Sequence, residues 1–258
     1  MNTQPQETMD NVLLESQLRQ LYLSSFIRHY AAFAAEAAHS NQSYSRYLLA
    51  LTEQELLERD VRRRERRLKE AKIPVVKDLA GFDFAAIPQL NPQQIRQLAQ
   101  GTYIEQAEPV ILVGNPGLGK THIASALALA ATQQMRRVRF YNAAVLVTEL
   151  LTAQTEGRLT AYLHKALNYQ LLVVDELGFI PFTSLGAQVM FQFCSTLYQR
   201  VALIITTNLK FADWTQVFGD ERLTVALLDR LTHRAHIIEF IGDSYRFRER
   251  QRRQEGQN

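Results

Sequence analysis

Apolar residues recur along the chain with two different spacings. Between residues 11 and 37 they lie three or four positions apart, as at Leu14, Leu18 and Leu21, which predicts one or two amphipathic helices. From residue 110 onwards, short aliphatic runs alternate with longer helical patterns at intervals of roughly thirty residues. Such alternation predicts strands joined by helices in a parallel, doubly wound α/β sheet.

Five aliphatic runs suit buried strands, and the segments between them suit helices. The predicted strands are 110–113, 138–141, 171–176, 201–206 and 236–241, and the predicted helices are 122–131, 144–154, 159–167, 185–200 and 223–232. Earlier in the chain, a helical pattern starts at Tyr44 after a polar break. Thr52 and Glu55 resemble a capping box, so we expect a further helix to open there and to end before Pro74.

Prolines, glycines and charge divide the chain into four segments. Residues 1–70 are typical of a small all-α domain whose last helix is basic, and residues 101–248 hold the α/β sheet. Residues 71–100 contain three prolines and a glycine around an apolar cluster, as expected of a connector that packs onto the sheet domain. Residues 249–258 form a basic tail that we expect to be disordered.

The stretch from Gly114 to Thr121 fits the phosphate-loop pattern G-x-x-x-x-G-K-[ST] and lies between a predicted strand and a predicted helix. Glycines let the backbone close around phosphate oxygens, and the following helix offers its free N–H groups. Lys120 would reach the β- and γ-phosphates, and the Thr121 hydroxyl would hold Mg²⁺. A glycine-rich turn that matches by chance is the alternative. The predicted nucleotide-binding residues are Gly114, Asn115, Pro116, Gly117, Leu118, Gly119, Lys120, Thr121 and His122.

Two carboxylates and an amide follow predicted strands. Asp175 lies 54 positions after Thr121, and the carboxyl ends of parallel strands share one edge of a sheet. Asp175 would hold Mg²⁺ through water, while Glu176 would orient and polarise the water that attacks the γ-phosphate. Asn208, after the next strand, can hydrogen-bond both that phosphate and that water. The alternative is that Asp175 and Glu176 only cap a following turn.

Composition is that of an ordinary globular protein, because 258 residues with 47% hydrophobic and 21% charged residues suffice for one or two domains. The single cysteine, Cys194, lies in an apolar stretch, which favours a buried thiol over a nucleophile. Residues 1–10 are polar, and nowhere do about eighteen uncharged apolar residues run together. We therefore expect a cytoplasmic protein without a membrane span.

The net charge of +3 is unevenly distributed. Residues 58–72 hold eight basic and four acidic residues, and residues 245–258 hold five arginines and two glutamates. A solvated helix face with internal ion pairs is one explanation of the first cluster. The excess of cations nevertheless favours contact with nucleic-acid phosphates. The DNA-binding candidates in this cluster are Arg62, Arg63, Arg64, Arg66 and Arg67.

Three landmarks in this order, Gly114–Thr121, Leu171–Glu176 and Thr206–Asn208, resemble those of the AAA+ ATPases. More narrowly, the chain resembles the IstB/DnaC group, and its N-terminal helices with their arginine run resemble the IstB-type ATP-binding helpers of insertion-sequence transposition. The segments that carry this narrower resemblance are Asp175–Gly178, Trp214–Asp220, Leu228–His233 and Gly242–Arg246.

The resemblance implies an AAA+ P-loop NTPase fold with a five-stranded parallel sheet in the order 5-1-4-3-2, which binds ATP and Mg²⁺. Only seventeen residues follow Ile241, too few for a full C-terminal lid, and Arg246 would approximate the lid's sensing arginine. Members assemble as rings or helices in which a neighbour's arginine touches the γ-phosphate. Arg230 is the matching position here, with Arg222 and Arg234 as rivals.

The resemblance also implies a DNA-binding element after the second strand. Residues 150–165, with Arg158 and Lys165, occupy that place. A helix that only covers the sheet explains the same apolar residues, so both interpretations stay open.

The implied function is that of an ATP-hydrolysing, DNA-binding protein that oligomerises on duplex DNA and assists a transposase in target selection and transposition. The main alternative is a DnaC-like loader of the replicative helicase, which would bind a helicase through residues 1–60. A small-molecule kinase and a nucleotide-gated binding module without turnover could share the phosphate loop. Asp175 and Glu176 together with Asn208 argue against the kinase.

Overall fold

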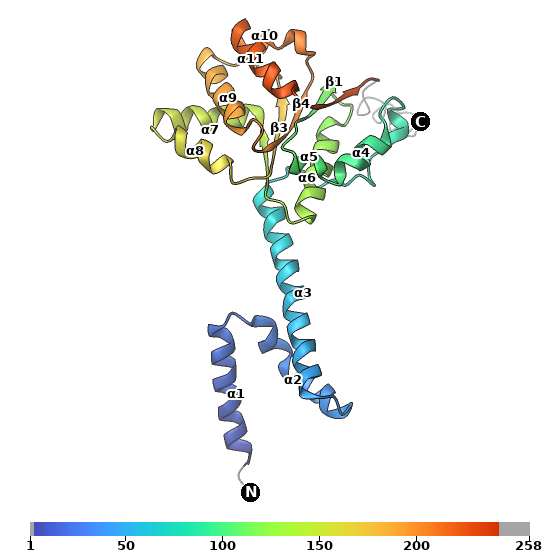
Figure 1. Ribbon diagram of the computed structural model, residues 1–258, viewed down its shortest axis with the longest axis vertical. Coiled ribbons are helices and arrows are strands. Elements are labelled where there is room, and N and C mark those ends of the chain that lie inside the picture. Colours follow the sequence, from blue (N-terminus) through green and yellow to red (C-terminus); the bar gives the residue numbers. More distant parts are fainter. Residues whose placement is uncertain (1–2, 243–258) are drawn as a thin grey trace, which may run out of the picture. The chain divides into compact units, whose positions relative to one another are not determined.

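The computed structural model describes residues 3–242, which form two compact units, one reaching to Arg66 and one starting at Arg67 (Figure 1). The boundary falls within a single helix, α3, which spans Tyr44–Ala71. The described residues do not include residues 243–246, with Arg246, or the basic tail 249–258. The four segments expected from the sequence therefore stay a prediction.

The helical unit contains α1 (Thr3–Gln20), α2 (Ser24–His39) and most of α3. The prediction that a helix begins at Thr52 was wrong, because Thr52 lies inside α3 and its hydroxyl donates to the carbonyl of Leu49 (2.7 Å). A serine before the helix plays the capping role instead, since the Ser43 hydroxyl accepts the N–H of Arg46 (3.3 Å).

Two carboxylates of α3 join it to α2. Glu55 is buried and accepts the backbone N–H of Ser25 (2.9 Å), while Glu58 accepts the hydroxyl of the same serine (2.7 Å). Hydrogen bonds from Gln54, Ser25 and His29 hold the pKa of Glu58 at about 2, well below its usual range. Charge and hydrogen bonding thus fix this helix pair where few apolar side chains are buried.

The second unit is an α/β sheet domain, and its five strands are all parallel in the order β2-β3-β4-β1-β5. This confirms the predicted strand order. The strands are β1 (Val110–Gly114), β2 (Val138–Asn142), β3 (Leu171–Leu177), β4 (Ala202–Thr207) and β5 (His236–Phe240). The helices are α4 (Pro92–Ala99), α5 (Thr102–Glu105), α6 (Lys120–Gln133), α7 (Ala143–Thr155), α8 (Leu159–Ala166), α9 (Ser184–Leu197), α10 (Thr215–Phe218) and α11 (Glu221–Thr232), with 3-10 turns at Phe84–Ala86 and Phe211–Asp213.

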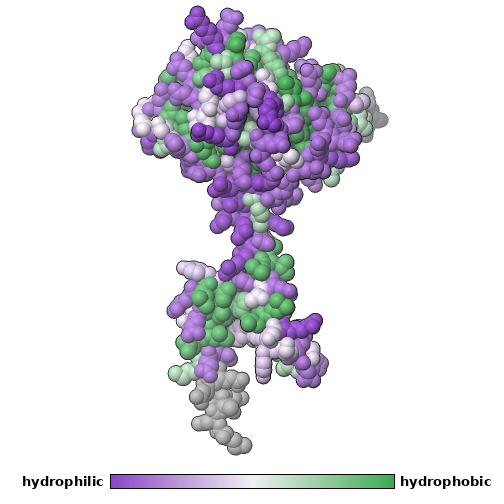
Figure 2. Space-filling view, in the orientation of Figure 1, coloured by the Kyte–Doolittle hydropathy of each residue, from purple (hydrophilic) through white to green (hydrophobic). Residues whose placement is uncertain are grey.

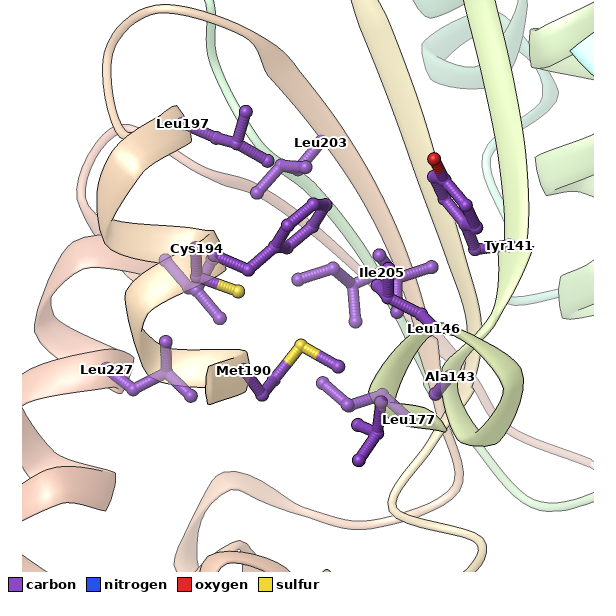
Figure 3. Packing of buried hydrophobic residues seen from close by; sticks show 14 of the residues in the cluster. Tyr141, Ala143, Leu146, Leu177, Met190, Cys194, Leu197, Leu203, Ile205 and Leu227 are labelled. Atoms are coloured by element: carbon purple, nitrogen blue, oxygen red, sulfur yellow. The ribbon is translucent and has the colours of Figure 1, made fainter. Parts of the chain in front are cut away.

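Alternate residues of each strand enter two separate cores, because successive side chains point to opposite faces of a sheet. Leu172 and Val174 of β3 pack with α7, α9 and α11, whereas Leu171 and Val173 pack with α4 and α6. Figure 3 shows the first of these cores, where side chains of α9 such as Met190 point toward β4. Both faces of the sheet are therefore covered by helices (Figure 1).

Two side chains of the first core match their sequence-based interpretation. Cys194 is buried, and burial raises the pKa of its thiol to about 12, so it is an inert core residue. Trp214 is 1% exposed and stacks on Phe218 at a centroid distance of 5.8 Å, which makes it a packing anchor.

The second core takes in the segment that precedes the sheet. Ile87, Leu90, Ile95 and Leu98 are buried against α6 and the strands, so residues 73–99 pack on the sheet domain. Asn91 caps α4, as its side chain accepts the N–H of Gln93 (2.9 Å).

Candidate nucleotide site

A pocket of about 940 Å³ opens at the carboxyl edge of the sheet. The segment between Val75 and Ile87 forms one wall, and the loop from Pro116 to His122 forms the floor. Glu176 after β3 and the sequence Thr206-Thr207-Asn208 at the end of β4 complete it. The sheet therefore brings together the three landmarks that the sequence separates by almost a hundred residues.

The loop between β1 and α6 has the open backbone expected of a phosphate cradle. Gly117 and Gly119 have φ values of 83° and 85°, in the left-handed region that favours glycine. A Cβ atom at Gly119 would lie 2.7 Å from Cε2 of Phe82, so the preceding segment lies directly on the loop. Lys120 is 8% exposed, and its Nζ donates to the carbonyls of Gly114 (2.6 Å) and Asn115 (2.8 Å). The ammonium thus sits inside the loop.

Three side chains form a hydrogen-bonded cluster beneath the loop. The hydroxyls of Thr121 (3.0 Å) and Thr206 (2.5 Å) both donate to Oδ1 of Asp175. Asp175 is 6% exposed, and burial raises the pKa of its carboxyl. A hydroxyl and a carboxylate within 3.0 Å of each other are two oxygen ligands of the kind that Mg²⁺ prefers.

Glu176 differs from Asp175 in that it is exposed and its backbone has a φ of 61°. Its Oε2 accepts a hydrogen bond from Nδ2 of Asn142 (2.9 Å), at the end of β2. The Oδ1 atom of the same amide accepts the N–H of Ala144 (3.0 Å) and caps α7. Sequence reasoning missed Asn142, although a polar residue directly after a predicted strand was the signal that had identified Asn208.

Two further predicted residues, Asn208 and His122, also line the pocket. Asn208 is half-buried and borders the pocket beside Thr207. The Nε2 atom of His122 lies 2.8 Å from the carbonyl oxygen of Asp78, and its ring meets Phe82 edge-on. His122 therefore joins the start of α6 to the wall formed by residues 75–87.

The chain matches the family of IstB-like ATP-binding proteins over residues 16–253. It belongs to this family. It is 36% identical over 239 residues, 93% of its own length and 90% of the relative's, to a Pseudomonas aeruginosa protein named for ATP binding in insertion sequence IS21. A Geobacillus stearothermophilus protein named in the same way for insertion sequence IS5376 is 33% identical over 237 residues, 92% of this chain and 94% of that relative.

Solved structures show the same fold for the sheet domain of this IstB-like chain. The replication initiator DnaA bound to AMPPCP and single-stranded DNA matches 69% of the chain with a TM-score of 0.54 and 18% identity, over 54% of its own length. DnaI matches 64% of the chain with a TM-score of 0.51 and 17% identity, over 91% of its own length. The AAA+ P-loop fold expected from the sequence is thereby confirmed.

The three arginines considered as partners of the γ-phosphate do not line the pocket of their own chain. Arg230, in the last turn of α11, donates to the carbonyl of Ala226 (2.8 Å), and its guanidinium lies 4.9 Å from the ring centre of Phe191. Arg222 is exposed at the start of α11, and Arg234 pairs with Glu108 (3.0 Å).

The arginines proposed for DNA differ in their contacts. Arg62 bonds to the hydroxyl of Ser24 (2.5 Å) and pairs with Glu55 (3.4 Å), and Arg67 pairs with Glu70 (3.3 Å). Arg63 and Arg64 are exposed, and neither makes a hydrogen bond or ion pair with any residue in 3–242. Arg66 is also exposed.

In the sheet domain, Arg158 precedes α8 and pairs with Glu156, while Lys165 is exposed in the last turn of that helix. None of the helices within residues 3–242 has both the length and the apolar content that a bilayer crossing needs.

Proposed function

We propose that this IstB-like protein hydrolyses ATP with Mg²⁺ and uses the nucleotide to assemble on duplex DNA and assist a transposase. The observation that carries the proposal is that Lys120, Thr121 and Glu176 line one pocket and that Asp175 accepts the hydroxyl of Thr121 beneath it. In this proposal Lys120 binds the β- and γ-phosphates, and Asn208 binds the γ-phosphate and the attacking water. Glu176 accepts the hydrogen bond of that water and polarises it.

The metal site fits the residues present. The Thr121 hydroxyl and Asp175 Oδ1 lie 3.0 Å apart, and Thr121 lines the pocket next to the loop that would hold the phosphates. Mg²⁺ bound there would offset the charge of the phosphate oxygens. The protein's part is to hold Thr121 and Asp175 in place, and buried hydroxyl contacts do so.

The position of Arg230 supports the proposal that the protein forms an oligomer. Arg230 lies near the end of α11, which leads into the start of β5, so it lies toward the edge of the sheet opposite the pocket. Since Arg230 does not line the pocket of its own chain, we infer that it would act at the pocket of a neighbouring copy. Mixing two inactive variants tests this: Lys120→Ala keeps Arg230, and Arg230→Ala keeps an intact pocket.

Activity in the mixture that exceeds the sum of the two variants supports a shared site. Because Arg222 and Arg234 are rival candidates, Arg222→Ala and Arg234→Ala are each mixed with Lys120→Ala in parallel. If the mixture is no more active than its components, Arg230 does not act in trans.

The surface of the helical unit also supports self-association. Leu18 and Leu51 are its buried large apolar residues among residues 9–66, and hydrophobic residues gather on its surface in Figure 2. An apolar surface of this extent favours a partner that covers it, and we propose a second copy of the chain. The exposed side chains are Met9, Val12, Leu13, Leu14, Leu21, Tyr22, Tyr44, Leu48, Leu49, Leu56, Leu57 and Val61.

Duplex DNA would contact basic side chains that are exposed. Arg63 and Arg64 are the candidates on α3, whereas Arg62 serves the contact between α2 and α3. Arg158 and Lys165 are the candidates in the sheet domain. Such contacts go to phosphates, so binding should depend strongly on salt and weakly on sequence.

A band shift with duplex DNA tests the central claim. We expect the unaltered protein to shift DNA with ATP, the Glu176→Gln variant to shift it more persistently, and Lys120→Ala to fail. Substituting Arg63 and Arg64 by glutamine should weaken the shift and lower its salt dependence, and Arg62→Gln serves as a control for helix packing. If Lys120→Ala binds DNA as the unaltered protein does, nucleotide does not control assembly.

The alternative, a helicase loader, predicts binding to a replicative helicase through residues 1–60. Pull-down of a helicase by the full chain, without any band shift of duplex DNA, would favour the loader over the transposition helper.

A further inference from the structure

The pairing of β3 with β4 is irregular beside the nucleotide site. Val174 pairs with Ile205, and pairing resumes with Leu177 opposite Thr207. Asp175 and Glu176 therefore stand together opposite the single residue Thr206. Two residues opposite one define a β-bulge, a device that redirects side chains at functional sites.

The bulge places an unusual demand on the backbone. Glu176 has a φ of 61°, a conformation that side-chain-bearing residues rarely adopt. A bulge also removes a ladder partner from the backbone, and an N–H group without a partner is unfavourable. Here the Thr206 hydroxyl takes the place of that partner, because its oxygen accepts the N–H of Glu176 (2.9 Å).

The same hydroxyl also acts as a donor. Its hydrogen goes to Oδ1 of Asp175 (2.5 Å), and a hydroxyl can donate one bond while it accepts another. Thr206 is 1% exposed and Asp175 is 6% exposed, so water does not compete effectively for either bond. One buried oxygen therefore fixes both the backbone of Glu176 and the carboxylate of Asp175.

The two bonds give the neighbouring carboxylates different directions. Asp175 is buried, and its Oδ1 also accepts the hydroxyl of Thr121 (3.0 Å). Glu176, the very next residue, is exposed and reaches the Nδ2 atom of Asn142. In a regular strand, two consecutive side chains would also diverge, but the left-handed turn at Glu176 sets where its side chain leaves the sheet.

We propose that Thr206 is a positioning residue of the ATPase site. Its hydroxyl holds the bulge so that Asp175 faces Thr121 at the proposed Mg²⁺ position and the side chain of Glu176 leaves the sheet at the pocket. Thr206 itself need touch neither nucleotide nor metal. The inference rests on the proposed ATP hydrolysis for its kinetic consequence, but not for its effect on the metal site.

Three variants separate the hydroxyl from the packing. Thr206→Val keeps the shape of the side chain and removes both hydrogen bonds, whereas Thr206→Ser keeps the hydroxyl. Thr132→Val is the matched control, because Thr132 lies outside the pocket, is 2% exposed, and donates its hydroxyl hydrogen to the carbonyl of Leu129 (2.7 Å). Thermal unfolding of each variant shows whether it is folded.

The kinetic measurement is ATP turnover at saturating nucleotide. We expect Thr206→Val to lower kcat by about 10- to 100-fold, the scale of a small misplacement of reacting groups, with little change in KM. Thr206→Ser and Thr132→Val should stay within about threefold of the unaltered protein, because both leave the Asp175 contact intact. If Thr206→Val has an unchanged kcat, or Thr206→Ser is as slow as Thr206→Val, the inference is overturned.

The second measurement is independent of turnover. The affinity for a fluorescent ATP analogue is measured with and without Mg²⁺, and the ratio gives the benefit of the metal. Loss of a residue that orients a metal ligand costs roughly 10- to 100-fold in metal affinity, so Thr206→Val should reduce this ratio and Thr132→Val should not. An unchanged ratio in Thr206→Val contradicts the inference.

The two measurements distinguish this inference from the proposed function. If the unaltered protein hydrolyses no ATP under any condition, the proposed hydrolysis fails, while the Mg²⁺ ratio still decides the role of Thr206. If Thr206→Val does not fold, Thr206→Ala removes the hydroxyl without adding a methyl group to the bulge, and the same two outcomes apply to it.

Discussion

The amide of Asn142 makes two contacts that substitutions can separate. Its Oδ1 caps α7 by accepting the N–H of Ala144 (3.0 Å), and its Nδ2 donates to Glu176 (2.9 Å). Asn142→Asp keeps an oxygen for the cap and loses the donor. Asn142→Ala loses both contacts. A comparison of the two variants therefore assigns an effect to the helix or to the carboxylate.

We expect the thermal stability of each variant to depend on whether it keeps the cap of α7. Replacing a capping asparagine by alanine costs about 1 kcal/mol. In a chain of this size that corresponds to a fall in Tm of roughly 2–4 °C. Asn142→Asp should melt close to the unaltered protein, because aspartate caps helices as well as asparagine does. Differential scanning calorimetry of the three proteins measures the difference.

We expect the rate of ATP hydrolysis to depend on the hydrogen bond between Asn142 and Glu176. Glu176 lines the pocket and Asn142 does not, so the bond draws the Glu176 carboxylate toward the end of β2. A hydrogen bond to a charged group contributes about 1.5–3 kcal/mol. If the carboxylate must leave the amide to polarise water, losing the bond lowers the barrier, and about 1.4 kcal/mol is tenfold in rate.

We therefore expect Asn142→Ala to hydrolyse ATP at least about tenfold faster than the unaltered protein in the absence of DNA. Phosphate release at saturating ATP and Mg²⁺ measures this, and nucleotide affinity measured separately shows that binding is intact. A rate that falls or does not change, with unaltered affinity, would refute the reasoning, because the amide would then align Glu176 for catalysis.

Three further outcomes follow from the geometry. Gly119→Ala places a Cβ 2.7 Å from Phe82 at a φ of 85°. The backbone conformation alone should lower the free energy of unfolding by about 1–2 kcal/mol, which calorimetry can measure. Adding Phe82→Leu should relieve the contact and restore part of the lost stability. Glu58 has a pKa of about 2 in the folded protein against an ordinary value of 4.5, so its stabilising effect is complete above about pH 4.5 and is lost as the pH falls toward 2. The difference in Tm between the unaltered protein and Glu58→Gln should therefore disappear between about pH 4.5 and pH 2. Trp214 has a buried Nε1 without a hydrogen-bond partner among residues 3–242, so Trp214→Phe should cost far less free energy of unfolding than the roughly 3–5 kcal/mol expected of Trp214→Ala in chemical denaturation.

Local pattern was sufficient for the strands of the sheet domain, but it did not predict the short helices α5 and α10. Every predicted strand lies within one or two residues of an observed one, because buried parallel strands are continuous aliphatic runs that little else in the chain imitates. The same approach failed at Thr52, where a capping-box sequence occurs inside a continuous helix. A capping box is defined by only two residues. The helical pattern on both sides of Thr52 is longer, and the helix continues through it.

The sequence by itself determined the phosphate loop, the strands and the identity of Lys120, Thr121, Asp175 and Glu176 as candidate groups, since each follows from neighbours in the chain. Tertiary structure alone decided that Asn142 holds Glu176, 34 residues away, and that Thr206 bonds to Asp175, 31 residues away. It also decided that Phe82 lies on Gly119. These contacts depend on which strand ends become neighbours and on a one-residue bulge, and neither is encoded in the spacing of residues along one strand.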